Sequence, residues 1–126
     1  MSVAYVDTSC LVALAFDERG AAALARRLAQ FTQLVSSNLL EAELRAVFAR
    51  ERRVWAPEST GRIAYVLPDR PLGPEIERVL EAGYLRGADC WHLASALYLA
   101  SDPALITFMT LDRTQAQIAE AIGFRK

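Results

Sequence analysis

Hydrophobic and polar positions along the chain form short blocks that predict strands followed by helices. Residues 3–6 are a β-favouring run that ends at the polar turn Asp7-Thr8-Ser9, and spaced apolar residues then predict a helix. Residues 105–111 form the most continuous apolar run, which is typical of a buried central strand, and this run ends at Asp112. Two polar turns that carry an aspartate therefore follow two apolar strands.

The middle of the chain continues this alternation. We predict a helix from about Arg19 to Phe31, a strand from Gln33 to Ser36, a helix to about Arg53 with Asn38 as its N-cap, and another helix that begins near Pro57.

Between Pro68 and Pro74 the chain holds three prolines and a glycine, which predicts a connector with room for only a short edge strand at residues 70–72. Helices are then expected over residues 74–85 and 89–99. The segment between them contains Gly87, which fits a helix C-cap.

Strands that alternate with helices favour an α/β fold with a mostly parallel sheet that is covered on both faces. In such sheets ligands bind beyond the carboxyl ends of the strands. The length of 126 residues and the hydrophobic content of 53% are typical of one domain, so residues 1–126 are expected to form a single domain.

Charge and cysteine content narrow the range of partners only slightly. The formal net charge of -1 provides no global positive field, so it neither suggests nor excludes RNA as a partner. Cys10 and Cys90 lack the spacing of a zinc site and are interpreted as small buried hydrophobes in a reducing cytosol. Without a signal peptide or a membrane span, the protein is expected to be soluble and cytoplasmic.

Asp7 and Asp112 are the first candidates for a functional site. Each follows an apolar strand and precedes a helix, so both carboxylates are expected at the same edge of the sheet. The alternative is that each aspartate only caps the helix after it, which is the better explanation for either residue alone.

Glu43 interrupts the apolar face of its predicted helix, whereas Glu41 has Arg45 four residues later and is the natural solvated ion-pair partner. A carboxylate that is directed at apolar packing is costly unless it is paired, protonated or bound to a cation. Glu43 is therefore the acid that most needs an explanation.

Asp89 begins a strongly apolar helix, where it is expected to act as the N-cap, a role that is compatible with metal binding. His92 lies three residues later and is a candidate general base. A structural role is the more common one for a lone histidine in the first turn of a helix.

A site that combines Asp7, Glu43, Asp89 and Asp112 would be destabilised by mutual repulsion unless a cation neutralised it. Oxygen ligands without a cysteine or a histidine pair favour Mg²⁺ or Mn²⁺ over zinc or copper. Such an ion lowers the pKa of a bound water and stabilises the charge that develops on phosphoryl oxygens.

Four segments of the chain, taken in order, resemble the PIN-domain nucleases, and within them the VapC-type toxins of toxin–antitoxin pairs. These segments are Tyr5-Val6-Asp7-Thr8-Ser9, Ser36-Ser37 followed by Glu43-Leu44, Arg86-Gly87-Ala88-Asp89-Cys90-Trp91-His92-Leu93-Ala94-Ser95-Ala96, and Met109-Thr110-Leu111-Asp112-Arg113. The similarity covers nearly the whole chain, and the Asp-x-x-His-Leu-Ala segment is its most specific element.

The resemblance implies a three-layer α/β/α sandwich and a Mg²⁺- or Mn²⁺-dependent endoribonuclease. It implies metal-binding, catalytic carboxylates at Asp7, Glu43, Asp89 and Asp112. It further implies that a hydroxyl of Thr8, Ser9 or Thr110 steadies them. It also implies an RNA substrate, a homodimer and a cognate antitoxin. Some relatives carry a further acid shortly after the fourth aspartate, where this chain has Thr114 and Gln115.

Two other functions are compatible with the sequence. The first is a PIN nuclease that is not a toxin and that acts in RNA processing or on DNA. The second is an inactive RNA- or protein-binding module in which the acids only cap helices. A pure binding module should bind no Mn²⁺, and metal should not raise its thermal stability.

Overall fold

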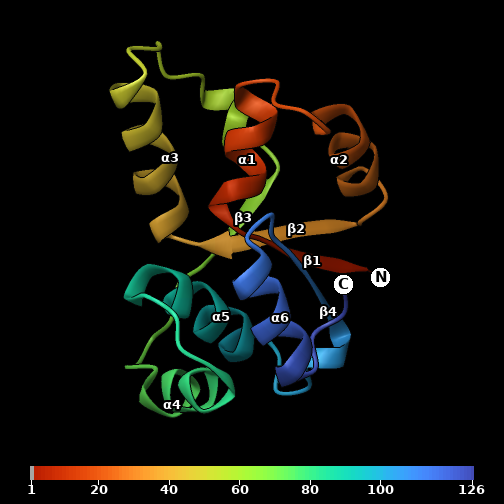
Figure 1. The fold of residues 1–126 in the computed structure, drawn as a ribbon, viewed down its shortest axis with the longest axis vertical. Coiled ribbons are helices and arrows are strands. Elements are labelled where there is room, and N and C mark those ends of the chain that lie inside the picture. The colour runs from red at the N-terminus through yellow and green to blue at the C-terminus, as the bar shows by residue number, and fades with distance from the viewer. Residues whose placement is uncertain (1) are drawn as a thin grey trace.

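The computed structural model describes residues 2–126 and places a four-stranded sheet between two layers of helices (Figure 1). The strands are β1 (Val3–Val6), β2 (Gln33–Ser37), β3 (Ile63–Val66) and β4 (Ile106–Met109). The helices are α1 (Thr8–Ala15), α2 (Ala21–Leu28), α3 (Leu39–Arg50), α4 (Gly73–Ala82), α5 (Gly87–Leu99) and α6 (Arg113–Ile122), with 3₁₀ helices η1 (Pro57–Thr60) and η2 (Pro103–Leu105).

The sheet has the strand order β3-β2-β1-β4, and every neighbouring pair is parallel. Val3 at the start of β1 is in register with Gln33 of β2 on one side and with Ile106 of β4 on the other. All four strands therefore end at the same edge. The predicted three-layer α/β/α sandwich with a mostly parallel sheet is confirmed.

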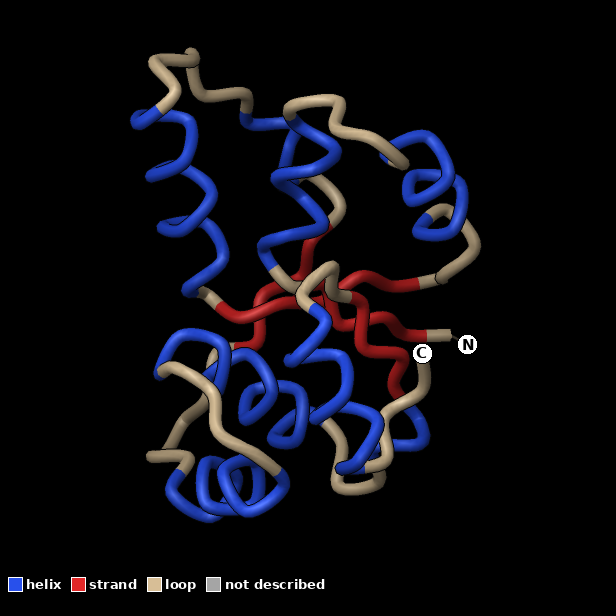
Figure 2. The backbone as a smooth tube through the Cα atoms, viewed as in Figure 1, coloured by secondary structure: helices blue, strands red, loops and turns tan. Residues whose placement is uncertain are grey.

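Each face of the sheet is covered by its own hydrophobic core. Helices α1 to α3 lie on one side of the strands and helices α4 to α6 on the other (Figures 1 and 2). Successive side chains of a strand point to opposite faces. Ala4 and Val6 therefore pack in the core on the side of α1 to α3, and Tyr5 packs in the core on the side of α4 to α6. Tyr5 also stacks on Phe108, with ring centroids 5.1 Å apart. Within residues 2–126, no helix is both long and apolar enough to cross a membrane.

Two predicted strands lie elsewhere in the sheet than expected. The edge strand is β3 at Ile63–Val66, paired with β2, whereas the prediction placed it at residues 70–72. The prolines of that segment lack the N–H groups that a ladder needs, while residues 63–66 are rich in β-favouring side chains. Likewise, β4 is buried as predicted, but it is the other outer strand and not a central one. Backbone bonds between Arg125 and residues 106 and 108 cover its outer side.

Three helix starts also differ from the predictions. Asn38 precedes α3 but makes no side-chain capping bond among residues 2–126, because its backbone is already helical; Ser37 Oγ accepts the Leu39 N–H instead, at 3.0 Å. Asp89 is not an N-cap either, since α5 begins at Gly87, which is consequently a helix start and not a C-cap. Near Pro57 only the short helix η1 forms.

The C-terminal end of α3 supplies a test of backbone strain. Arg53 N–H donates to the Phe48 carbonyl and Arg52 N–H to the Ala49 carbonyl, which closes the helix while Arg52 adopts a φ of 54°. We expect Arg52→Gly to raise the free energy of unfolding by about 0.5–1 kcal/mol, because glycine adopts this conformation without strain. Urea titration measures the change.

The exposed residue Ala49 offers a matched control within the helix. Ala49→Gly should instead lower the free energy of unfolding by about 1 kcal/mol, since glycine is unfavourable inside a helix. A loss of stability in Arg52→Gly equal to that in the control would show that the turn holds no strain.

Candidate active site

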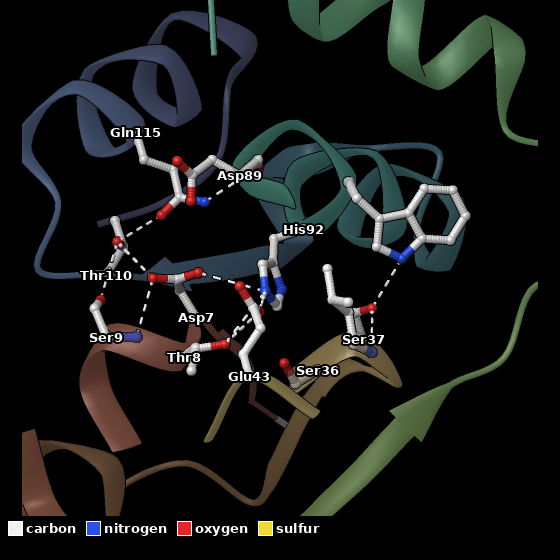
Figure 3. Close-up of polar contacts among 12 residues, drawn as sticks. Asp7, Thr8, Ser9, Ser36, Ser37, Glu43, Asp89, His92, Thr110 and Gln115 are labelled. Atoms are coloured by element: carbon white, nitrogen blue, oxygen red, sulfur yellow. Dashed lines mark hydrogen bonds and ion pairs between the residues drawn. The ribbon is translucent and has the colours of Figure 1, made fainter. Parts of the chain in front are cut away.

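The four acids predicted from the sequence come from four separate elements at the carboxyl edge of the sheet. Asp7 follows β1, Glu43 lies on α3, Asp89 lies in the first turn of α5, and Asp112 follows β4. Figure 3 shows Asp7, Glu43 and Asp89 around one space between the helix layers. Asp7 is buried, Glu43 and Asp89 are partly buried, and Asp112 is exposed. The acidic edge is thus open to solvent on one side.

Asp7 is fixed by both its backbone and its side chain. Its N–H donates to the Met109 carbonyl at 2.9 Å, which ties the end of β1 to the end of β4. Its Oδ2 caps α1 by accepting the Ser9 N–H at 3.2 Å, while its Oδ1 lies 3.7 Å from His92 Nε2. The predicted helix cap is confirmed, and it occupies only one of the two carboxylate oxygens.

Glu43 has two hydrogen-bond donors on the same oxygen. Thr8 Oγ1 donates to Glu43 Oε1 at 2.7 Å, and His92 Nε2 lies 2.7 Å from the same atom. Burial raises the pKa of Glu43, but the bonds from His92 and Thr8 outweigh it and hold the pKa below its usual value. Glu43 therefore needs a cation less than its apolar flanks predict, because Thr8 and His92 already stabilise its charge.

The surroundings of Asp89 disfavour its ionised form. Burial raises its pKa, and the nearby charges of Asp7, Asp112 and Glu43 raise it further. Arg86 opposes this effect only weakly, since the closest approach of its guanidinium is 3.9 Å and its side chain is 84% exposed. Because Asp89 does not cap its helix, capping does not explain its position.

Asp112 has the capping role that the sequence predicted for it. Its Oδ1 accepts the Gln115 N–H at 2.8 Å at the start of α6. The predicted ion pair between Glu41 and Arg45 also forms, at 3.1 Å on the exposed side of α3. Glu41 is consequently separate from the acidic edge.

The three predicted hydroxyl groups all contact this edge. Thr8 bonds Glu43, and Thr110 Oγ1 lies 3.3 Å from Asp7 Oδ2. Ser9 Oγ accepts the Leu111 N–H at 3.0 Å, so it holds the loop after β4.

Gln115 is a site residue that the sequence reasoning did not single out. It is fully buried, accepts from Thr110 Oγ1 at 2.7 Å, and donates to the Asp89 carbonyl at 3.2 Å. It therefore connects the segment after β4 with the first turns of α5 and α6, next to Asp89 (Figure 3). Its signal in the sequence is a polar residue at helical spacing from the buried residues Ile118 and Ala119.

The donor chemistry of this edge fits a hard divalent cation. Four carboxylates from four elements provide only oxygen ligands, and the repulsion that raises the pKa of Asp89 is the kind that a cation relieves. Within residues 2–126, no three side chains of His, Cys, Asp or Glu converge closely enough to form a ready-made metal site. The fit therefore rests on the donor set and not on ligand geometry.

Comparison with known families and proteins gives one match. Residues 4–121 match a family model that is described as the PIN domain, and this range includes all four acids. Comparisons with curated proteins and with solved structures found no significant match.

Proposed function

Because this chain belongs to the PIN-domain family, whose members are generally nucleases that use divalent metals, we propose that it is a Mg²⁺- or Mn²⁺-dependent endoribonuclease. The observation that carries the proposal is the placement of Asp7, Glu43, Asp89 and Asp112 from four elements at one edge of the sheet. Asp7 and Asp112 also cap helices, whereas Glu43 and Asp89 have no capping role.

In this proposal the four carboxylates hold the metal ion. A bound ion would supply an activated water and neutralise charge on the phosphoryl group that is attacked. Thr8 and His92 orient Glu43, while the Ser9 N–H holds Asp7 at the end of β1. Thr110 Oγ1 lies 3.3 Å from Asp7 Oδ2, but its hydrogen is directed to Gln115. Arg86 lies three residues before Asp89 and Arg113 directly follows Asp112, and both are exposed, which suits contact with RNA phosphates.

We further propose that the protein is the toxin of a toxin–antitoxin pair. In this proposal it forms a homodimer and binds a cognate antitoxin. The VapC-like segments around Asp7, Glu43, Asp89 and Asp112 support this. A groove between α4 and α5, lined by residues that include Leu80, Tyr84 and Trp91, with Tyr84 79% exposed, is the candidate contact for a partner chain.

The proposal predicts that the double variant Asp7→Asn, Asp89→Asn loses Mg²⁺-dependent cleavage of RNA and no longer arrests growth when expressed. Glu41→Gln is the matched control, because Glu41 lies on the same helix as Glu43 but pairs with Arg45 away from the acids. The control should cleave RNA at nearly the wild-type rate. Cleavage is followed on gels with Mg²⁺ and with EDTA.

Full activity in the freshly purified double variant would refute the proposal. Titration calorimetry with Mn²⁺ separates the remaining alternatives: a wild-type protein that binds no Mn²⁺ would be a binding module and not a nuclease. Metal-dependent cleavage without growth arrest would retain the nuclease and reject the toxin.

A further inference from the structure

A chain of buried hydrogen bonds leads from β2 to the Glu43 carboxylate. The Ser37 N–H lies 2.9 Å from the Tyr5 hydroxyl, and that hydroxyl lies 2.8 Å from His92 Nδ1. On the other side of the ring, His92 Nε2 lies 2.7 Å from Glu43 Oε1. Ser37, Tyr5 and His92 are completely buried, so water does not compete for these bonds.

The donors and acceptors in this series of hydrogen bonds indicate which ring nitrogen of His92 carries a hydrogen. The Ser37 N–H can only donate, so it fills an acceptor position of the Tyr5 oxygen. A phenol keeps its own hydrogen at neutral pH, since its ordinary pKa is about 10. The Ser36 and Ser95 side chains also lie near the Tyr5 hydroxyl. Within residues 2–126, however, the acceptor that meets hydrogen-bond geometry with this hydroxyl is His92 Nδ1, at 2.8 Å. With Nδ1 accepting, the hydrogen of a neutral imidazole is on Nε2, which faces Glu43.

The two carboxylate oxygens of Glu43 are consequently not equivalent. Oε1 accepts from Thr8 Oγ1 and from His92 Nε2, whereas no hydrogen bond to Oε2 is found within residues 2–126. The Glu43 side chain is 29% exposed, although His92 behind it is fully buried. A hydrogen bond to one carboxylate oxygen also fixes the orientation of the other oxygen. That second oxygen then loses little freedom when it binds a metal.

We propose that His92 is a positioning residue whose Nε2–H holds Glu43 Oε1, so that Oε2 is the oxygen presented to a divalent cation. The Tyr5 hydroxyl sets this orientation by donating to Nδ1. The inference rests on the proposed function, because it assumes that Glu43 is a metal ligand. It differs from a general-base role, since a base would need Nε2 without hydrogen.

The wild-type protein tests the first step directly. His92 is the only histidine in the chain, so a nitrogen-15 spectrum of untagged protein shows a single imidazole. We expect hydrogen on Nε2 in the metal-free protein at neutral pH. An Nε2 that lacks hydrogen would overturn the proposal.

Two variants of His92 test the second step. His92→Gln keeps an amide N–H near the position of Nε2, whereas His92→Asn keeps only a group near the position of Nδ1. We expect His92→Asn to bind Mn²⁺ at least about 10-fold more weakly than wild type, and His92→Gln to recover most of that loss. Calorimetry gives the affinities, and thermal unfolding in EDTA shows that both variants are folded.

The outcomes separate this inference from the function on which it rests. If the wild-type protein binds no Mn²⁺, the proposed function fails. A second outcome is that the wild type binds Mn²⁺ and that folded His92→Gln and His92→Asn bind it with equal affinity. The positioning role of Nε2–H then fails, whether that affinity equals the wild-type value or is weaker. The spectrum of the wild type decides the orientation even if neither variant folds.

Discussion

Replacing Asp89 by asparagine should abolish RNA cleavage and at the same time stabilise the metal-free protein. Activity should fall by at least about 100-fold, because loss of a metal ligand should exceed the 10- to 100-fold effects of outer-shell changes. Stability should rise because the variant removes a charge that Asp7, Asp112 and Glu43 repel, and because Asp89 caps no helix. Cleavage assays and thermal unfolding in EDTA measure the two effects.

The stability gain should depend on pH with a definite sign. The folded state raises the pKa of Asp89, so it binds a proton there more tightly than the unfolded chain does. The ionised side chain therefore destabilises the fold above its raised pKa, and this cost disappears as pH falls below about 3.9, the usual value for aspartate. The advantage of Asp89→Asn over wild type should be largest at neutral pH and absent at pH 3.

Asp112→Asn is the control for this prediction. It also removes one negative charge from the edge, but asparagine can still cap α6 through the Gln115 N–H. Because Asp112 is exposed, its stability gain should be smaller than that of Asp89→Asn. A lower melting temperature for Asp89→Asn than for wild type at pH 7.5 would contradict the repulsion that motivates the prediction.

Gln115→Ala should lower the free energy of unfolding by about 2–4 kcal/mol, a larger loss than the substitution of glycine at the exposed Ala49 should cause. Gln115 is fully buried, so alanine leaves a cavity and also removes the side-chain donor to the Asp89 carbonyl. Thr110 Oγ1 loses its shorter acceptor as well and is left with Asp7 Oδ2, 3.3 Å away. Urea unfolding measures the loss, and Mn²⁺ calorimetry shows whether the acids remain in place.

Gln115→Met separates the packing of this residue from its hydrogen bonds. Methionine has a similar length and fills the space, so this variant should lose only the hydrogen-bond contribution, about 1–3 kcal/mol. A methionine variant as stable as wild type would mean that the bonds to Thr110 and Asp89 contribute nothing. In that case Gln115 would be a packing residue only.

The parallel sheet and the edge that carries the acids were predictable from the sequence. Strands that end at Asp7 and at Asp112 must place both residues at one edge once the sheet is parallel, whatever the strand order. The position of β3 was not predictable in the same way, because residues 63–66 become a strand by pairing with β2. Such pairing depends on distant residues and not on local pattern.

The spacing of apolar residues along single helices also led to a wrong prediction of which acid most needs a cation. Glu43 interrupts an apolar stripe, but Thr8 and His92, which are 35 and 49 residues away, supply the donors that it needs. Asp89 was expected to cap α5, yet the helix begins two residues earlier at Gly87. Both differences arise from contacts between separate elements, which spacing along one helix does not contain.

Tyr5 belongs at once to the core of the sheet and to the hydrogen bonds behind the acids. Its ring stacks on Phe108 among buried residues, and its hydroxyl contacts His92. A core substitution that moves this ring by a few tenths of an ångström therefore also moves the imidazole that contacts Glu43. Engineering this protein for thermal stability should leave Tyr5 and Phe108 unchanged, since the interior and the acidic edge cannot be optimised independently at this point.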